Sequence, residues 1–265
     1  MKRTLAVLFL SLCFLLPRGL VGQENRQGFL VGLQGGMGYG TYRDLGASPL
    51  TYCGLELTPG LKVGFLRPAW RYEVQLKIVG GGYGYKLGLD NMQAFSGQAN
   101  INVMAMHRTS WQGRWQMWLG ASLDERADIR YNSALGNSSV GASNFINLNF
   151  LGRTELYLKH WMMHAQLALT PVSLVLRPGF AYMDNYTHEI GNPTADFMKQ
   201  YGWYLAGATS VATDLGATLV LSNGNRVGLS YRWHYISSRA TASSAAPYCF
   251  EQSGHAVLVE LEFKL

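Results

Sequence analysis

Two cysteines have the chemistry that is simplest to predict in this chain. Cys53 and Cys249 each follow a tyrosine, and they are the cysteines that remain once an amino-terminal leader is removed. Two thiols in an oxidising compartment favour a disulfide, and secreted chains tend to pair their cysteines. The alternative is two buried free thiols.

The other residues that could do chemistry do not form a recognised metal or cofactor motif. The six histidines are scattered, and the chain has no Cys-x-x-Cys pair of the kind that binds zinc. The runs Gly35-Gly36 and Gly80-Gly81-Gly82 lie in alternating segments, whereas a phosphate-binding loop lies between a strand and a helix. We therefore expect neither a metal nor a cofactor.

The chain begins with a leader that predicts export. Met1–Thr4 is basic, Leu5–Leu16 is apolar, and a small residue precedes Gln23. The apolar run is shorter than the roughly 18 residues of a spanning helix, which favours a cleaved signal peptide over a membrane anchor. We place the signal peptide at residues 1–22 and a single domain at residues 23–265. Removal of the three leader cations lowers the net charge from +6 to +3, so we expect no nucleic-acid partner.

Apolar side chains recur at every second position through most of the remaining chain. In the last segment, Gly254–Leu265, the odd positions from Val257 onwards are apolar and the even positions from Glu260 onwards are charged. This alternation predicts a strand with one apolar and one polar face. About ten such segments follow one another. We expect short turns at 67–70, 108–113, 159–162 and 222–225, and long loops at 43–53, 85–95, 130–143, 177–201 and 237–251.

Three local features refine this pattern. Pro59 and Pro171 fall inside predicted strands, where each removes a ladder hydrogen bond, so we expect a bulge or a strand boundary at each. Asn223-Gly224 is the pair that a type I′ hairpin requires. Aromatic residues gather at the two ends of the strands, as two girdles would. They are Phe29, Phe65, Trp70, Tyr72, Trp111, Trp115, Trp161 and Phe263 at the turn ends, and Tyr39, Tyr42, Tyr83, Tyr85, Tyr131, Phe145, Trp233 and Tyr235 at the loop ends.

No apolar run after the leader is long enough for a transmembrane helix, so a membrane-spanning chain must close into a barrel. Charged residues make up only 14%, against about 25% in soluble domains. The export signal, the alternating strands and a last strand with Phe263 and Leu265 on its apolar face resemble the small outer-membrane β-barrel proteins of Gram-negative bacteria.

The resemblance implies an all-β fold. We expect a closed antiparallel transmembrane β-barrel of about ten strands (8–12) in the outer membrane, with both termini on the periplasmic side. Outer-membrane lipid and the barrel-insertion machinery are the expected partners. In such a barrel Cys53 ends the first long loop and Cys249 ends the fifth. If the last strand pairs with the first, these loops are neighbours, and we predict a Cys53–Cys249 disulfide across the seam.

Charged side chains of both signs fall on the face that turns inward. One interpretation is a lumen packed with ion pairs, because buried charges need partners. The other is a selective pore. A barrel of about ten strands favours the packed lumen, since an aqueous channel needs more strands. The inward charges are Glu56, Lys62, Arg71, Glu73, Lys77, Arg153, Glu155, Lys159, Asp214, Arg232, Glu260, Glu262 and Lys264.

Some small outer-membrane barrels are hydrolases. The lipid A deacylases use a His-x-Ser pair, and the nearest match here is His234 with Ser237. That spacing is one residue too long, so the two side chains face opposite sides unless a bulge intervenes. Omptin-type proteases use paired aspartates and an Asp-x-His, whereas Asp184 and His188 are four residues apart here. A catalytic role is therefore the alternative, not the preferred hypothesis.

The fourth long loop is the richest surface candidate. A loop of this length is usually functional or disordered, and aromatic residues mixed with polar ones suit binding. Its candidate residues are Phe180, Tyr182, Tyr186, His188, Glu189 and Asp196. We predict a monomeric, non-catalytic barrel with a structural role or a binding role towards an envelope protein or an extracellular ligand. A barrel hydrolase and a narrow pore are the alternatives.

Overall fold

The computed structural model describes residues 28–45, 50–85, 94–133, 140–178, 201–205, 208–239 and 249–265. Within these ranges the chain forms strands throughout, and no helix there is long and apolar enough to cross a membrane. The strands are β1 (Gly28–Asp44), β2 (Thr51–Leu57), β3 (Gly60–Leu66), β4 (Trp70–Gly84), β5 (Ala94–Gln112), β6 (Trp115–Asn132), β7 (Val140–Leu158), β8 (Trp161–Pro178), β9 (Tyr201–Leu205), β10 (Ala208–Val220), β11 (Arg226–Ser238) and β12 (Phe250–Lys264).

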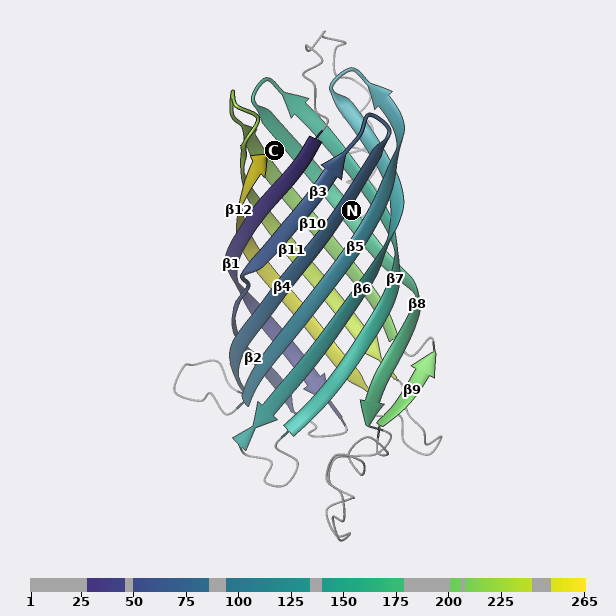
Figure 1. Cartoon of the computed structure of the whole chain (residues 1–265). Helices are drawn as coiled ribbons and strands as arrows, with labels where there is room; N and C mark the ends of the chain where they lie inside the picture. Colours follow the sequence, from purple (N-terminus) through teal and green to yellow (C-terminus); the bar gives the residue numbers. More distant parts are fainter. Residues whose placement is uncertain are drawn as a thin grey trace, which may run out of the picture.

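The strands close into one antiparallel barrel. β1 pairs with β12 from Leu30–Lys264 to Asp44–Phe250, so the first and last strands meet along their full length. β2 and β3 share one position between β1 and β4, and β9 and β10 share another beside β8. The barrel thus has ten strand positions, and the predicted fold is confirmed (Figure 1).

The two ends of the barrel differ in their connections. The connections of two to five residues at 67–69, 113–114, 159–160 and 221–225 lie at one end, which we call the turn end. β1 begins and β12 finishes there, at the top of Figure 1. The strand ends that the five longer connections join lie at the opposite end, which we call the loop end. The start of β1 and the end of β12 therefore lie on the same side of the membrane, as an even number of strand positions requires.

The last short turn differs from the predicted type I′ hairpin. A type I′ turn needs positive φ at both central residues. Gly224 has a φ of 84°, but Asn223 does not have a positive φ. Leu221 and Asn225 close the turn through a hydrogen bond of 2.8 Å from the Leu221 amide to the Asn225 carbonyl. Three residues therefore lie between them, the arrangement in which a type I turn precedes a left-handed glycine.

The two prolines interrupt the ladder in different ways. Two residues of β8, Thr170 and Pro171, lie opposite the single residue Asn149 of β7, which is the predicted bulge. Pro59 separates β2 from β3, but the pairing with β1 keeps the same register on both sides. The boundary predicted at Pro59 is therefore a gap in the ladder without an extra residue.

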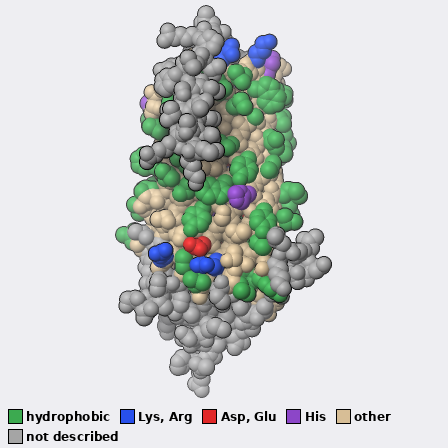
Figure 2. Space-filling view, turned by 180° about the vertical axis from the view of Figure 1, so that it is seen from behind, with side chains coloured by type: hydrophobic (Ala, Val, Ile, Leu, Met, Phe, Trp, Pro, Cys, Tyr) green, Lys and Arg blue, Asp and Glu red, His purple; other side chains and the backbone are tan. Residues whose placement is uncertain are grey.

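The outer wall is apolar over the middle of the barrel, as Figure 2 shows for one face. Exposed outward side chains there include Met37, Phe150 and Leu229. Polar outward pairs appear nearer the loop end, where the Asn144 amide donates to Glu125 at 3.0 Å. Only lipid can cover so much apolar wall, and a closed barrel leaves no sheet edge unpaired in it. The barrel therefore spans a membrane.

The strands extend further towards the loop end than the sequence predicted. β5 and β7 have 19 residues each, whereas about ten suffice to span a bilayer. The extra length is where Tyr42, Tyr83 and Phe145 lie. We predicted these three in the lipid-facing girdle, and this was wrong, because they point into the lumen and are at most 5% exposed.

Candidate functional site: the closed lumen

Ion pairs fill the lumen near the turn end. Arg71 on β4 contacts Glu73 at 3.0 Å and Glu155 on β7 at 2.8 Å. Glu155 also contacts Arg153 at 2.7 Å and accepts a hydrogen bond from the Trp118 indole at 3.2 Å. Three strands, β4, β6 and β7, thus contribute to one buried cluster, which we call the ionic cluster. Burial of these charges is tolerable because each has a partner of opposite sign.

A second set of charges adjoins the seam between β12 and β1. Lys62 on β3 contacts Glu260 at 2.9 Å and Glu262 at 2.5 Å. Glu262 also contacts Arg226 on β11 at 3.5 Å. The same alternation that puts apolar residues of β12 in lipid puts these carboxylates in the lumen.

Aromatic and aliphatic side chains fill the lumen at the loop end. Tyr42 stacks on Tyr52 with ring centres 5.2 Å apart, and Phe145 stacks on Phe250 at 5.6 Å. Tyr83 packs edge-on against Tyr42 at 5.1 Å. We call this set the aromatic cluster. Its members are Tyr42, Tyr52, Tyr83, Ala94, Phe145, Val175, Ala208, Ile236 and Phe250, all buried.

Two arginines cover the aromatic cluster. Arg130 lies 4.5 Å from the ring centre of Phe250, and Arg177 lies 5.1 Å from it. Both guanidinium groups also contact Asp44, at 3.2 Å and 2.9 Å. Cation–π contacts of this kind gain strength when water is excluded. Packed rings under a layer of paired charges therefore occupy the loop end of the lumen.

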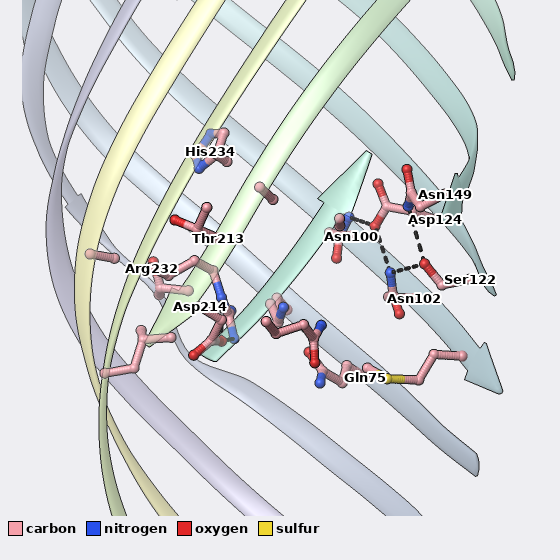
Figure 3. A pocket seen from close by; sticks show the side chains of 18 of the residues that line it. Gln75, Asn100, Asn102, Ser122, Asp124, Asn149, Thr213, Asp214, Arg232 and His234 are labelled. Atoms are coloured by element: carbon pink, nitrogen blue, oxygen red, sulfur yellow. Dashed lines mark hydrogen bonds and ion pairs between the residues drawn. The ribbon is translucent and has the colours of Figure 1, made fainter. Parts of the chain in front are cut away.

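A cavity of about 200 Å³, lined by many polar and charged residues, lies between the ionic cluster and the aromatic cluster (Figure 3). On one wall, Asp124 on β6 accepts amide hydrogen bonds from Asn100 at 2.5 Å, Asn102 at 3.4 Å and Asn147 at 3.4 Å. On the other, Asp214 on β10 contacts Arg232 at 2.7 Å.

Two histidines also face this cavity. His164 Nε2 lies 3.1 Å from Asp214 Oδ1, and His234 projects from β11 (Figure 3). Glycines make room for both rings, because a Cβ on Gly216 or Gly254 would lie 2.4 Å from the nearest ring carbon. The buried nitrogens His164 Nδ1 and His234 Nε2 have no hydrogen-bond partner among the described residues. Within those residues, no three metal-binding side chains converge.

No protein-family model matches the chain, and no curated protein matches it in sequence. Solved structures do match. The outer membrane protease OmpT from Escherichia coli aligns with a TM-score of 0.57 at 7% identity, over 94% of this chain and 99% of that one. The fold is that of an outer-membrane β-barrel. The translocator domain of the autotransporter NalP from Neisseria meningitidis aligns with a TM-score of 0.46 at 11% identity, covering 92% and 90%. OprG from Pseudomonas aeruginosa has a TM-score of 0.35 at 10% identity, covering 90% and 97%.

The fold comparison and the apolar outer wall both place this β-barrel in the outer membrane. OmpT shares the architecture at an identity too low to carry function. The predicted class and the outer-membrane location are confirmed at this level, and lipid is the partner that the exposed wall requires.

The predicted disulfide between Cys53 and Cys249 is absent, and both thiols are free. The register explains why. Cys53 pairs with Thr41 on one side of β1, while the Cys249 carbonyl accepts from Leu45 on the other side. Two strand spacings of about 5 Å and four residues of about 3.3 Å therefore separate the cysteines. A disulfide needs Cα atoms within about 7 Å, so neighbouring loops were not enough.

The candidate catalytic pair does not converge. His234 faces the lumen, whereas Ser237 lies on the outward face of the same strand. β11 pairs with β10 and β12 without a register shift from Arg226 to Ser238, so no bulge brings the two together. Asp184 and His188 lie outside the described residues.

The proposed binding loop also lies outside the described residues. This applies to Phe180, Tyr182, Tyr186, His188, Glu189 and Asp196. Sequence reasoning also missed the aromatic cluster, because an aromatic residue near a strand end normally indicates a lipid boundary. A signal was present, since Tyr42 and Tyr83 share the alternation phase of inward residues such as Gln34 and Gln75.

Proposed function

We propose that this outer-membrane β-barrel is a closed, non-catalytic scaffold that presents its loop end for binding or for a structural role in the envelope. The observation that carries the proposal is the filled lumen. The ionic cluster lies across it near the turn end, and the aromatic cluster lies across it at the loop end. A barrel closed twice by packed side chains is built for rigidity, and loops placed on a rigid scaffold commonly carry the function.

Barrel size supports this over the pore alternative. About eight strands leave a barrel interior just filled by side chains, and wide channels need 16 or more. With ten positions, the lumen here holds paired charges and stacked rings in the described residues. The orientation with the turn end in the periplasm and the loops outside is part of the proposal, as is monomeric assembly.

The separated His234 and Ser237 give no support to the deacylase alternative. The likeness to a protease in the comparison concerns the fold. The partner in the proposal is an envelope protein or an extracellular ligand, bound through loop residues that include Tyr182, Tyr186 and Asp196.

Conductance separates scaffold from pore. Purified protein in planar lipid bilayers should give no steady single-channel current, with a general porin in the same membrane as the positive control. Long-lived openings of uniform size would overturn the closed scaffold.

The binding role is tested in cells. Residues 179–200 are replaced by a short Gly-Ser turn, and the matched control shortens the connection at 134–139. A partner that cross-links to the wild type and to the control, but not to the 179–200 replacement, is expected. Equal cross-linking of all three proteins would argue against this loop.

A further inference from the structure

Two of the charges that line the central cavity, Lys77 and Asp124, have opposite signs and lack an ion-pair partner among the described residues. Lys77 on β4 lines the cavity and has no hydrogen bond or ion pair within the described residues. Asp124 on β6 is held by three side-chain amides and by no cation. Most other lumen cations are paired, since Lys62, Arg71 and Arg232 each contact a carboxylate.

Arg126 and Glu56 also line the cavity without an ion-pair partner in the described part of the chain, but both have neutral hydrogen-bond partners. Arg126 donates to Gln98 at 2.8 Å and also to Gln252. Glu56 accepts from the Tyr83 hydroxyl. Both groups therefore have neutral partners towards the aromatic cluster, although the Arg126 Nε has none among the described residues. Lys77 is half-buried on the cavity wall, and none of its three donors has a partner among the described residues.

The wall around Asp124 presents acceptors. The side-chain oxygens of Asn102 and Asn147 are buried and have no partner among the described residues. Their amide nitrogens are used by Asp124, so the free oxygens lie beside an anionic carboxylate. A group with several N–H donors and a positive charge suits this wall best.

The two charges are spaced for a small molecule. Lys77 pairs with Asn100 across to β5, and Asn102 of β5 pairs with Asp124 of β6. Lys77 and Asp124 therefore stand two strands apart, about 10 Å, and two residues apart along the strand. The volume of about 200 Å³ exceeds the roughly 150 Å³ cavity that holds one benzene. The cavity therefore has room for a molecule of about that size.

We propose that the lumen cavity binds a small zwitterion of the amino-acid class, with its carboxylate on Lys77 and its ammonium at Asp124, Asn102 and Asn147. A simple anion would leave the acceptor wall unsatisfied, and a simple cation would leave Lys77 unpaired. Apart from Tyr235, no aromatic residue among the described ones lines the cavity, so it offers little stacking surface for a sugar or a base. This site is separate from the loop-end role proposed above.

Three related probes, which differ in the charged groups they carry, test the idea. L-Alanine carries both charged groups, propionate lacks the ammonium, and ethylamine lacks the carboxylate. Detergent-solubilised protein is incubated overnight with each labelled probe, because exchange requires the aromatic cluster to open, and binding is measured by equilibrium dialysis. Alanine should bind at least tenfold more tightly than either single-charge probe. Equal affinities, or no binding of alanine, would overturn the proposal.

Two variants and a control locate the site. Lys77→Met should abolish the difference between alanine and ethylamine, and Asp124→Asn should abolish the difference between alanine and propionate. Lys159→Met, which removes an exposed lysine in a turn, is the control and should bind as the wild type does. Heat-modified mobility on gels checks that each barrel is folded.

Stability gives a readout that does not depend on ligand. Lys77→Met removes a half-buried cation that has no ion-pair partner among the described residues. Its denaturation midpoint should therefore rise without ligand, and alanine should no longer raise it further. In the wild type alanine should raise the midpoint by mass action. The proposal would be wrong if alanine left the wild-type denaturation midpoint unchanged, or raised it equally in the wild type and in Lys77→Met. Either result would indicate a cavity filled by water. Neither result bears on the conductance test of the scaffold.

Discussion

The two ends of the lumen are closed by different chemistry. The ionic cluster depends on reciprocal pairs, so each of its members is needed by another: Arg71 serves Glu73 and Glu155 at once. The aromatic cluster depends on packing, where each ring contributes contacts but leaves no charge behind when it is removed. A single substitution in the ionic cluster should therefore lower the free energy of unfolding strongly. A truncation in the aromatic cluster should lower it in proportion to the side-chain volume removed.

The largest effect is expected from Arg71→Met. It leaves two buried carboxylates without their shared cation, which should cost about 3–5 kcal/mol in the free energy of unfolding. Denaturant titration in lipid vesicles, followed by tryptophan fluorescence, measures the change. Adding Glu73→Gln and Glu155→Gln should recover part of the loss. A single variant with near wild-type stability would break the comparison.

Ile236→Ala in the aromatic cluster should cost less. Ile236 is 1% exposed, and truncation leaves a cavity among apolar side chains, worth about 2–3 kcal/mol. The same titration applies, with the lipid-facing Leu229→Ala as control. A loss equal to that of Arg71→Met would remove the distinction between the ends.

Tyr83→Phe tests the boundary between the aromatic cluster and the charged part of the lumen. The Tyr83 hydroxyl donates to Glu56 beneath the aromatic cluster. Removal keeps the ring packing but leaves a buried acceptor unsatisfied, at about 1–2 kcal/mol. An unchanged midpoint would mean that Glu56 finds another donor.

The smallest effect at the loop end is expected from the cysteines. Because Cys53 and Cys249 are too far apart to bond, the double change to serine should alter stability by less than about 0.5 kcal/mol under oxidising conditions. A thiol assay on unfolded, unreduced protein should find two free thiols per mature chain. One intramolecular disulfide would show that the barrel seam has a different register.

Alternation alone was enough to predict the barrel, because lipid outside and packed charge inside impose one rule on every strand. It placed Lys62, Arg71 and Glu155 in the lumen and anticipated the bulge at Pro171. It failed at the loop end, where apolar residues also face inward. At that end, Tyr42 and Phe145 look like residues of a lipid-facing aromatic girdle, and Phe250 looks like a loop residue. The alternation therefore predicts strands that are shorter than those in the structure.

The sequence by itself therefore determined which face of each strand meets lipid, since that depends on residues two apart in the chain. The tertiary structure decided everything that depends on register: which carboxylate pairs with Arg71, why Cys53 misses Cys249, and how Lys77 comes to share a cavity with Asp124. Register is a relation between strands. It follows from closure of the whole barrel, which no local pattern records.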